Sequence, residues 1–413
     1  MITKNEEDNP MTDLFHDAKK LMPILSRHRR WLHAHPGAAF DLADTLAYVR
    51  TELEALGLSP VPCGRAGLTA VIGSGTPCIL LRADMDALPI PEESGEAFAS
   101  ANGCMHACGH DLHTAMLLGA AQLLKAREAE LEGTVKLMFQ PAEEIFEGAK
   151  DMIAAGVLES PTPGAALMLH VTVGAPLPAG TVIAMAPGVS ASAADYFTIR
   201  IQGRGCHGST PHLGIDAITA AAHTLLALQE LHARELAPGT EAVLTVGTIR
   251  GGTAPNAIAD SCTLEGTIRT FDEGIRSQLK ERLRAISTAV AAAYRAAANL
   301  EFGSGAPTLV NDAELARAVP GWLREILPAD MVLSAADFPA GSRAGGSEDF
   351  AYVSQKVPTL MLALAAGSSA DGYTHPLHHP KVRLDENAMP FGAAALAHTA
   401  MRWLETGSDG TTA

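Results

Sequence analysis

The stretch Cys78-Ile79-Leu80-Leu81-Arg82-Ala83-Asp84-Met85-Asp86 decides which kind of fold this chain can adopt. A short, mainly apolar run that ends in acidic residues predicts a strand buried on both faces. Strands of that kind belong to parallel sheets whose two faces are covered by helices. The segment therefore predicts an α/β layer with carboxylates at the carboxyl end of one strand.

The same pattern recurs on both sides of this strand. Apolar or alternating runs predict further strands at 68–72, 134–140 and 165–170. Helical spacing of apolar residues predicts helices at 12–35, 42–56, 113–130 and 149–155. Because helices separate the strands, the sheet should be largely parallel, and its ligands should gather beyond the carboxyl ends of the strands.

A different pattern begins near Ser190. Strands are predicted at 196–202, 242–249, 261–270 and 300–302, with helices at 216–232 and 272–298. This β-α-β-β-α-β order is typical of a ferredoxin-like domain. Helices and a buried run at 359–366 then resume the first pattern. We therefore expect a discontinuous α/β catalytic domain, residues 12–190 and 305–405, with a ferredoxin-like lid or dimerisation domain inserted at 191–304.

Composition narrows the class of protein. The chain has 413 residues, of which 47% are hydrophobic and 18% charged, which is typical of a compact enzyme of two domains. A formal net charge of −16 argues against a nucleic-acid partner, because phosphate binding needs a basic face. The acidic N-terminus has no export signal, no apolar run has transmembrane length, and the six cysteines are scattered. We expect a cytoplasmic protein without a disulfide framework.

Metal-ligating residue types stand in loops after these apolar runs. Cys108 and His110 share a loop that contains a glycine, Glu143 and Glu144 follow the strand at 134–140, and His170 ends another strand. Thiolate, imidazole and carboxylate groups suit a borderline-soft divalent metal. Of two adjacent glutamates, one can bind metal while the other accepts a proton from water. The pattern predicts a metallohydrolase.

Some of these residues have simpler explanations. Glu143 and Glu144 could form the acidic first turn of a helix. Asp84 and Asp86 could be turn aspartates, or carboxylates that support a ligand histidine.

His106 and His110 have the i, i+4 spacing of a zinc-binding pair on a helix. Gly109 argues against a helix before Asp111, so His110 is the better candidate and His106 is expected in the loop. His113 is expected in the first turn of the next helix.

The inserted region offers fewer signals. Residues 203–209 form a glycine-rich loop that exposes His207, and a lone loop histidine is usually only solvated. Residues 251–256 and 266–270 look like hairpin segments. Gly345–Phe350 could begin a helix with Ser347 as its cap, and such a helix end would suit an anionic group of a substrate.

Together these segments resemble a known family, the di-metal aminoacylases and carboxypeptidases among the metallopeptidases. Within it the chain is most similar to amidohydrolases typified by hippurate hydrolase and the indole-acetyl amino acid hydrolases. The matching segments follow one another in the order of the family and are Arg82–Pro89, Met105–Asp111, Gln140–Glu144, Leu169–His170, Gly251–Asn256, Gly346–Phe350 and Leu377–Pro380.

The resemblance implies a catalytic domain with two divalent metal ions per subunit, which could be zinc, manganese, cobalt or nickel. It assigns Glu143 as general base and Asp86 as the carboxylate that supports the site. The metal ligands it implies are Cys108, His110, Glu144, His170 and His378. His379, beside the last of these, is not counted among them.

The same resemblance implies a lid that forms the interface of a homodimer or higher homo-oligomer. His207 would reach the site of the neighbouring subunit and stabilise the oxyanion, with help from Asn256. Arg269 would meet the carboxylate of the substrate, near backbone donors around Gly346.

Two positions depart from the family pattern. Gly37 follows His35 and Pro36 where the family usually has glutamate, and Cys206 stands where a glycine commonly precedes the lid histidine. The first lies far from the expected ligands in the sequence. The second places a polarizable side chain beside His207.

The expected activity is hydrolysis of the amide of an N-acyl amino acid, with acetyl, benzoyl or a similar acyl group, by metal-activated water. A dipeptidase or carboxypeptidase of the same family is an alternative. Two others are a nucleophilic Cys108 with His110 or His106 as base, and a structural zinc site in a protein that is not an enzyme. The first leaves Glu143, Glu144, His170 and His378 without roles. Structural zinc sites are closed and rich in thiolates, whereas this cluster has one plausible cysteine and an additional carboxylate.

Overall fold

The computed structural model describes residues 10–339 and 346–408. These residues form two compact units, the first comprising 10–190, 310–339 and 349–408, the second 191–309 and 346–348. Gly345, one end of the segment expected to start a helix, lies outside the described residues. Among the helices described, none is both long and apolar enough to cross a membrane.

The first unit is built on one mixed sheet of eight strands in the order β1-β2-β4-β3-β5-β16-β6-β15. Its centre is parallel, since β3 pairs in parallel with β4 and β5, and β16 in parallel with β5. Antiparallel pairs, β1 with β2 and β2 with β4, extend one edge. The strands are β1 (Val61–Cys63), β2 (Gly67–Gly73), β3 (Cys78–Asp84), β4 (Thr134–Gln140), β5 (Ala165–Thr172), β6 (Val182–Ala184), β15 (Val332–Ser334) and β16 (Thr359–Ala365).

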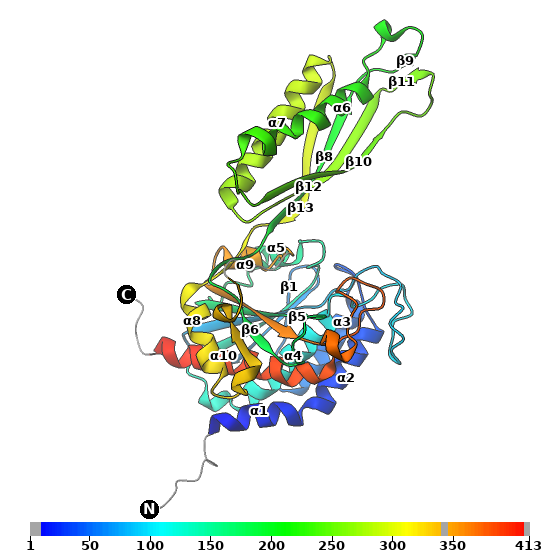
Figure 1. Cartoon of the computed structure of the whole chain (residues 1–413). Coiled ribbons are helices and arrows are strands. Elements are labelled where there is room, and N and C mark those ends of the chain that lie inside the picture. Colours follow the sequence, from blue (N-terminus) through cyan, green and yellow to red (C-terminus); the bar gives the residue numbers. More distant parts are fainter. Residues whose placement is uncertain (1–9, 340–345, 409–413) are drawn as a thin grey trace, which may run out of the picture. The chain divides into compact units, whose positions relative to one another are not determined.

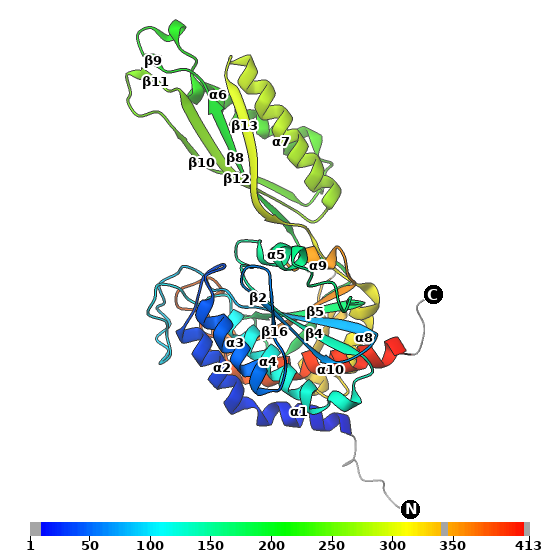
Figure 2. The same cartoon turned by 180° about the vertical axis from the view of Figure 1, so that it is seen from behind.

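Helices cover both faces of this sheet, as the α/β prediction required. Figures 1 and 2 show α1, α2, α4 and α10 on one face and the short α5 and α9 on the other. The helices of the unit are α1 (Pro10–Lys20), α2 (Met22–Ala34), α3 (Ala43–Ala55), α4 (His110–Ala126), α5 (Gly148–Ala154), α8 (Ala313–Leu323), α9 (Ala351–Ser354) and α10 (Met389–Ser408).

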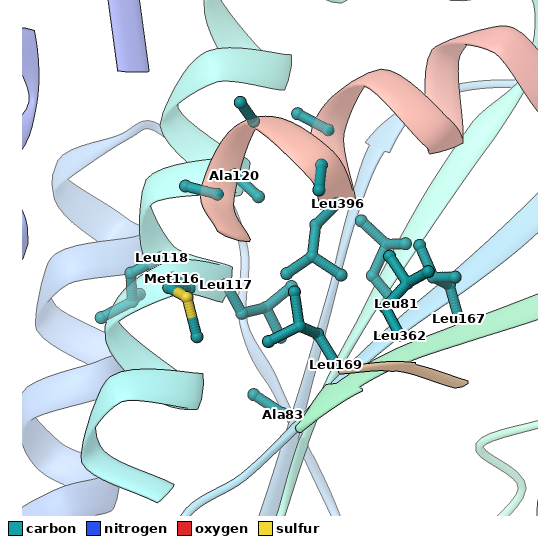
Figure 3. Packing of buried hydrophobic residues seen from close by; sticks show 14 of the residues in the cluster. Leu81, Ala83, Met116, Leu117, Leu118, Ala120, Leu167, Leu169, Leu362 and Leu396 are labelled. Atoms are coloured by element: carbon teal, nitrogen blue, oxygen red, sulfur yellow. The ribbon is translucent and has the colours of Figure 1, made fainter. Parts of the chain in front are cut away.

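The core lies between the sheet and the larger helical layer. Leu81, Leu167 and Leu362 on three neighbouring strands pack together with Leu117 of α4 and Leu396 of α10 (Figure 3). All five side chains are buried, and burying a leucine contributes roughly 1.5–3 kcal/mol. This packing fixes α4, and with it the residues of its first turn, against the carboxyl ends of the central strands.

The second unit has a four-stranded antiparallel sheet in the order β10-β12-β8-β13. Along the chain the order is β8 (Ala193–Gln202), α6 (Ala217–Leu228), β10 (Ala242–Gly251), β12 (Ser261–Thr270), α7 (Glu273–Ala293) and β13 (Ala297–Ala306). β9 (Cys206–His207) and β11 (Ala257–Ile258) form a separate two-stranded sheet in the same unit. The strands β7 (Gly188–Ala191) and β14 (Leu309–Asn311) lie where the chain passes from one unit to the other.

Several predicted elements differ from those observed. The helix expected at 12–35 is two helices, because α1 ends at Lys20 and α2 begins at Met22 with Pro23 in its first turn. A proline lacks the backbone N–H that a continuous helix needs. The helix expected at 272–298 ends at Ala293, since Arg295 adopts a φ of 64° and the chain then enters β13.

Two helix starts also need correction. α4 begins at His110, earlier than expected, with Gly109 at a φ of 86° as its N-cap. The expected helix start around Ser347 is wrong: α9 begins at Ala351, its N-cap is Phe350, and no side chain caps it. With only four residues it offers no anion site of its own.

Candidate metal centre

The candidate centre forms where the parallel strands β3, β4 and β5 end at the same edge of the sheet. Asp84 and Asp86 follow from β3, Glu143 and Glu144 come after β4, and His170 lies in β5. His110 enters from the first turn of α4. Parallel pairing therefore brings together residues that are far apart in the sequence.

The donor atoms fall into two groups of three that share Cys108. Cys108, His110 and His170 form one group, and Cys108, Glu144 and His378 form the other, each with its donor atoms within 4.8 Å of one another. The Cys108 Sγ lies 3.6 Å from His170 Nε2 and 3.3 Å from His378 Nε2. A carboxylate oxygen of Glu144 lies 3.6 Å from His378 Nε2. This arrangement places two further ligand candidates on each side of one shared sulfur.

The hydrogen bonds of these side chains fit the binding of a divalent metal. His110 Nδ1 donates to the carbonyl of Asp86 at 2.8 Å, and His170 Nδ1 donates to the carbonyl of Val171 at 2.7 Å. In its neutral form each ring thus keeps an Nε2 lone pair for the centre. Burial lowers the pKa of His170 to about 3, whereas Asp84, Asp86 and Cys108 outweigh burial and raise the pKa of His110 well above its usual value. Within the described part of the chain, His110 Nε2 and Glu144 Oε1 are buried without a hydrogen-bond partner. Buried polar atoms are rarely left unpaired, and a histidine held by its other nitrogen is the usual arrangement of a metal ligand.

Asp86 fixes the loop that carries the two glutamates. Its carboxylate accepts from the backbone N–H of Glu143 at 2.9 Å and of Glu144 at 3.2 Å. Glu143, Glu144 and His110 present donor atoms within 4.8 Å of one another. The carboxylate of Asp86 thus acts on the backbone of this loop, while Glu143 stands beside the ligand candidates.

A buried network supports the centre from behind. Asp84 accepts from Arg82 Nη1 at 2.7 Å and from His113 Nδ1 at 2.6 Å, and His113 Nε2 accepts from the backbone N–H of Val171 at 2.9 Å. Burial alone would raise the pKa of Asp84, but Arg82, His110 and His113 hold it well below its usual value. Asp84 is therefore a fixed negative charge next to His110, whose Nε2 lies 3.5 Å away.

The pKa shifts of Glu144 and Cys108 are consistent with a site that binds a cation. Burial raises the pKa of Glu144 to about 7, against an opposing effect of His110, and burial also raises the pKa of the Cys108 thiol above its usual range. Both shifts come from removing a negative charge from water, and a bound divalent metal would reverse them.

Part of this arrangement differs from what the sequence predicts. His113 was expected only as a residue of the first helical turn, yet it bonds Asp84; its i, i+3 spacing from His110 on one helix was the available signal. His106 lies in the loop as expected but is buried, and it belongs to none of the donor groups. His379 stacks on His375 and accepts from the backbone of Lys381, so it too stands outside them.

Within the second unit, two of the expected site residues lie together and one lies apart. His207 pairs with Ala257 in register, and the N–H of Gly208 donates to the carbonyl of Asn256 at 2.8 Å. Arg269 stands eight residues along β12 from Ser261, roughly 26 Å at the rise of an extended strand. His207 and Asn256 therefore lie beyond the end of the four-stranded sheet where Ser261 pairs with Gln202, and Arg269 lies towards its other end.

Arg269 is held by the segment at 346–348. Its Nη1 donates to Ser347 Oγ at 2.8 Å, Ser347 Oγ lies 3.0 Å from Ser192 Oγ, and the N–H of Ser192 donates to the carbonyl of Gly346 at 3.1 Å. The role of Ser347 is thus to bind a guanidinium group, in place of the helix cap expected from the sequence.

The two departures from the family pattern have local explanations. A side chain at Gly37 would place its Cβ 2.0 Å from the carbonyl oxygen of Asp41, so a glutamate there would require the backbone to move. Cys206 is half-buried and directs its thiol to the carbonyls of His207 and Thr210.

Known proteins are similar to this chain in both sequence and fold. The model of peptidase family M20/M25/M40 matches residues 80–402. N-acetyl-L-cysteine deacetylase of Bacillus subtilis (strain 168) is 38% identical over 413 residues, covering 99% of this chain and 94% of that protein. IAA-amino acid hydrolase ILR1-like 2 of Arabidopsis thaliana is 36% identical over 384 residues, covering 91% of this chain and 84% of that protein.

Among solved structures, a dinuclear metal-binding peptidase of the M20 family from Bacillus subtilis superimposes with a TM-score of 0.75 at 33% identity. The match covers 94% of this chain and 99% of that one. These similarities confirm the resemblance that the motifs indicated. This chain is a member of peptidase family M20/M25/M40.

Proposed function

We propose that this amide-cleaving hydrolase acts on N-acyl amino acids and releases a carboxylic acid and a free amino acid. The observation that carries the proposal is the pair of donor groups that share Cys108, with Glu143 beside them. The names of two relatives, an N-acetylcysteine deacetylase and an amino acid conjugate hydrolase, support the substrate class.

In this proposal Cys108, His110 and His170 hold one divalent ion, and Cys108, Glu144 and His378 hold a second. When bound, the metals would polarise the amide carbonyl and lower the pKa of water. The mixture of one thiolate, imidazoles and a carboxylate suits zinc, manganese, cobalt or nickel. His378 is 53% exposed, so the second group opens toward solvent.

Glu143 would act as the general base in this site. Asp86 accepts a hydrogen bond from the backbone N–H of Glu143. The carboxylate of Glu143 lies near His110 and Glu144, but Glu143 belongs to neither of the two groups that contain Cys108. Glu143 would take a proton from water as the water oxygen attacks the carbonyl carbon. It would then pass that proton to the nitrogen as the C–N bond breaks, which balances the reaction.

The rival chemistries fit this geometry less well. A nucleophilic Cys108 needs a thiolate, yet burial raises the pKa of this thiol. A structural zinc site is closed and rich in thiolates, whereas this centre has one cysteine and an additional carboxylate. A peptidase that removes C-terminal residues would use the same centre and differ only in the acyl side of its substrate.

The ferredoxin-like unit would serve as a lid that completes the site of a neighbouring subunit in a homodimer. Its strand order, and the placement of His207 and Asn256 towards the opposite end of the unit from Arg269, support a division of labour between two subunits. His207→Ala and Glu143→Gln chains, each inactive alone, should then recover activity when mixed, with about one working site per mixed dimer. If confirmed subunit exchange restores nothing, His207 does not act across subunits.

A cation on the lid would select substrates with a free α-carboxylate. Arg269 is half-buried and oriented by Ser347, and a guanidinium can hold a carboxylate through two parallel hydrogen bonds. N-acetyl and N-benzoyl amino acids should therefore be hydrolysed far better than their carboxamides, with a loss of roughly 10² in kcat/KM. Arg269→Ala should remove most of that preference. Equal turnover of the acid and the carboxamide by the unmodified enzyme would contradict both the role of Arg269 and the substrate class.

A further inference from the structure

His33 on α2 lies between two carboxylates of other segments. Its Nδ1 is 2.8 Å from Asp111 Oδ2 and its Nε2 is 2.9 Å from Glu92 Oε1. The side chains of His33, Asp111 and Glu92 are 4%, 0% and 0% exposed. Ionised carboxylate oxygens only accept hydrogen bonds, so both nitrogens of this ring carry a proton and the imidazole is a buried cation.

A second cation, Arg29, pairs with Asp111 beside this ring. Arg29 Nε donates to the same Asp111 oxygen at 3.2 Å, and Arg29 Nη1 lies 3.2 Å from Glu386. Phe98 packs edge-on against the ring of His33 with 5.3 Å between centroids, and the ring of His106 lies 6.3 Å away. Close pairing and exclusion of water strengthen such ion pairs, and removing one partner leaves a buried charge unpaired.

Glu92 anchors a long loop through this contact. Residues 89–104 form no regular strand or helix, and their ends are joined by a bridge between Leu88 and Met105. The Glu92 carboxylate also accepts from the N–H of Ser100 at 2.7 Å and from the hydroxyl of Ser94. Most other residues of the loop are exposed or half-exposed. His33 of α2 thus connects Asp111 of α4 to Glu92, the residue whose side chain is buried in this loop.

Both sides of this contact reach segments that carry proposed metal ligands. Asp111 follows His110 in the first turn of α4. On the loop side, the N–H of Glu93 donates to the carbonyl of Pro380 at 2.8 Å, two residues after His378. The backbone of His378 in turn donates to the carbonyl of Ala107 at 2.9 Å.

We infer that His33 is a positioning residue for the metal centre: its imidazolium joins Asp111 to Glu92 and so holds the two segments that carry His110 and His378 at binding distance. The inference rests on the proposed metal ligands. His33 belongs to neither of the groups that share Cys108, and its effect is to lower the freedom of the proposed ligands before metal binds.

His33→Gln tests this, because glutamine is neutral and carries both of its N–H groups on one nitrogen, whereas the ring of His33 meets the two carboxylates with two different nitrogens. Zinc affinity, measured by competition with a chromogenic chelator, should weaken roughly 10-fold, at the low end of the effect of groups behind metal ligands. Cleavage by a glutamate-specific protease at Glu93 or Glu96 should become several-fold faster. Glu92→Gln, which removes only the loop contact, should shift both measurements in the same direction.

His28→Gln is the matched control. His28 is buried on the same helix, but its Nδ1 bonds the hydroxyl of Tyr48, away from any ligand segment. It should leave zinc affinity and loop cleavage unchanged even if it lowers stability. Unchanged zinc affinity in both His33→Gln and Glu92→Gln, while Cys108→Ala loses metal, would overturn the role of His33 alone. If Cys108→Ala also kept full zinc binding, the proposed ligands would fail with it.

Discussion

Glu143 and Glu144 are neighbours in the chain, yet they should fail in different ways when altered. Glu144 presents an oxygen to His378 and His110, whereas Glu143 stands outside the two groups that share Cys108. Glu143→Gln should keep its metal and lose at least ~100-fold in kcat, because the amide cannot accept the proton. Glu144→Gln should lose metal. Elemental analysis beside steady-state kinetics makes the comparison, and substantial activity in Glu143→Gln would place the base elsewhere.

At the scale of single residues, the sequence indicated the chemistry better than it indicated the supporting contacts. Cys108, His110 and His170 could be grouped because each follows an apolar run. The bonds of Asp84 to His113 and of His33 to Asp111 could not, since they join segments 29 and 78 residues apart and depend on how α2 and α4 pack. Ser347 was assigned to a helix cap because Ser followed by acidic residues has that local pattern, but its hydroxyl binds Arg269.

Among the elements, β4 is connected to the segment after α5 by one buried cation. Lys136, 4% exposed, donates to the carbonyls of Val157 at 3.0 Å, Glu159 at 2.6 Å and Pro161 at 2.9 Å. Lys136→Met keeps the apolar stem but leaves these carbonyls unpaired. It should lower the free energy of unfolding by about 2–3 kcal/mol, measured by urea denaturation.

Lys150→Met provides the comparison for this prediction. Lys150 forms a partly exposed pair with Glu147 at 2.6 Å on one helical turn, and such pairs contribute roughly 0–1 kcal/mol. Comparable losses in the two variants would show that the three carbonyls find other partners without Lys136.

The strands and helices that carry the site were predictable because their hydrophobic patterns are strong. β4 and β12 match the predicted bounds, 134–140 and 261–270. The predicted bounds are wrong mainly at helix ends, because a single residue can determine where a helix stops. Pro23 divides the first predicted helix, and Arg295 ends α7 although the alanine-rich pattern continues. Short strands such as β6 and β15 have three residues each and leave no periodic signal.

For the whole molecule, His33 predicts how stability depends on pH. Burial would lower its pKa, but Asp111 and the bonds to Asp111 and Glu92 outweigh burial and the nearby Arg29 and raise it to about 9, against an ordinary 6.5. Because the pKa of His33 is higher in the folded than in the unfolded protein, protonation of its ring stabilises the fold. This contribution is complete below about pH 6.5 and is lost as the pH rises through about 9. The difference in unfolding free energy between the unmodified metal-free protein and His33→Gln should therefore shrink from pH 6.5 to 9.

The corresponding difference for His28→Gln should stay constant from pH 7 to 10. Burial lowers the pKa of His28 to about 4, so this ring is neutral throughout that range in the folded protein. A pH-independent difference for His33→Gln would mean that its ring is neutral in the folded protein.

The first unit is interrupted in the sequence by the second, and this sets an order of events during synthesis. Residues 191–309 are continuous and contain the whole four-stranded sheet, so they can fold as soon as they leave the ribosome. The eight-stranded sheet must wait for β16, which pairs with β5 across almost 200 residues of chain, and α10 emerges later still. His378 follows β16, so the centre gains its last proposed ligand near the end of translation. A nascent chain stalled before β16 would expose the apolar face of β5 beside an already folded neighbour, and it is at this stage that the chain most needs protection from aggregation.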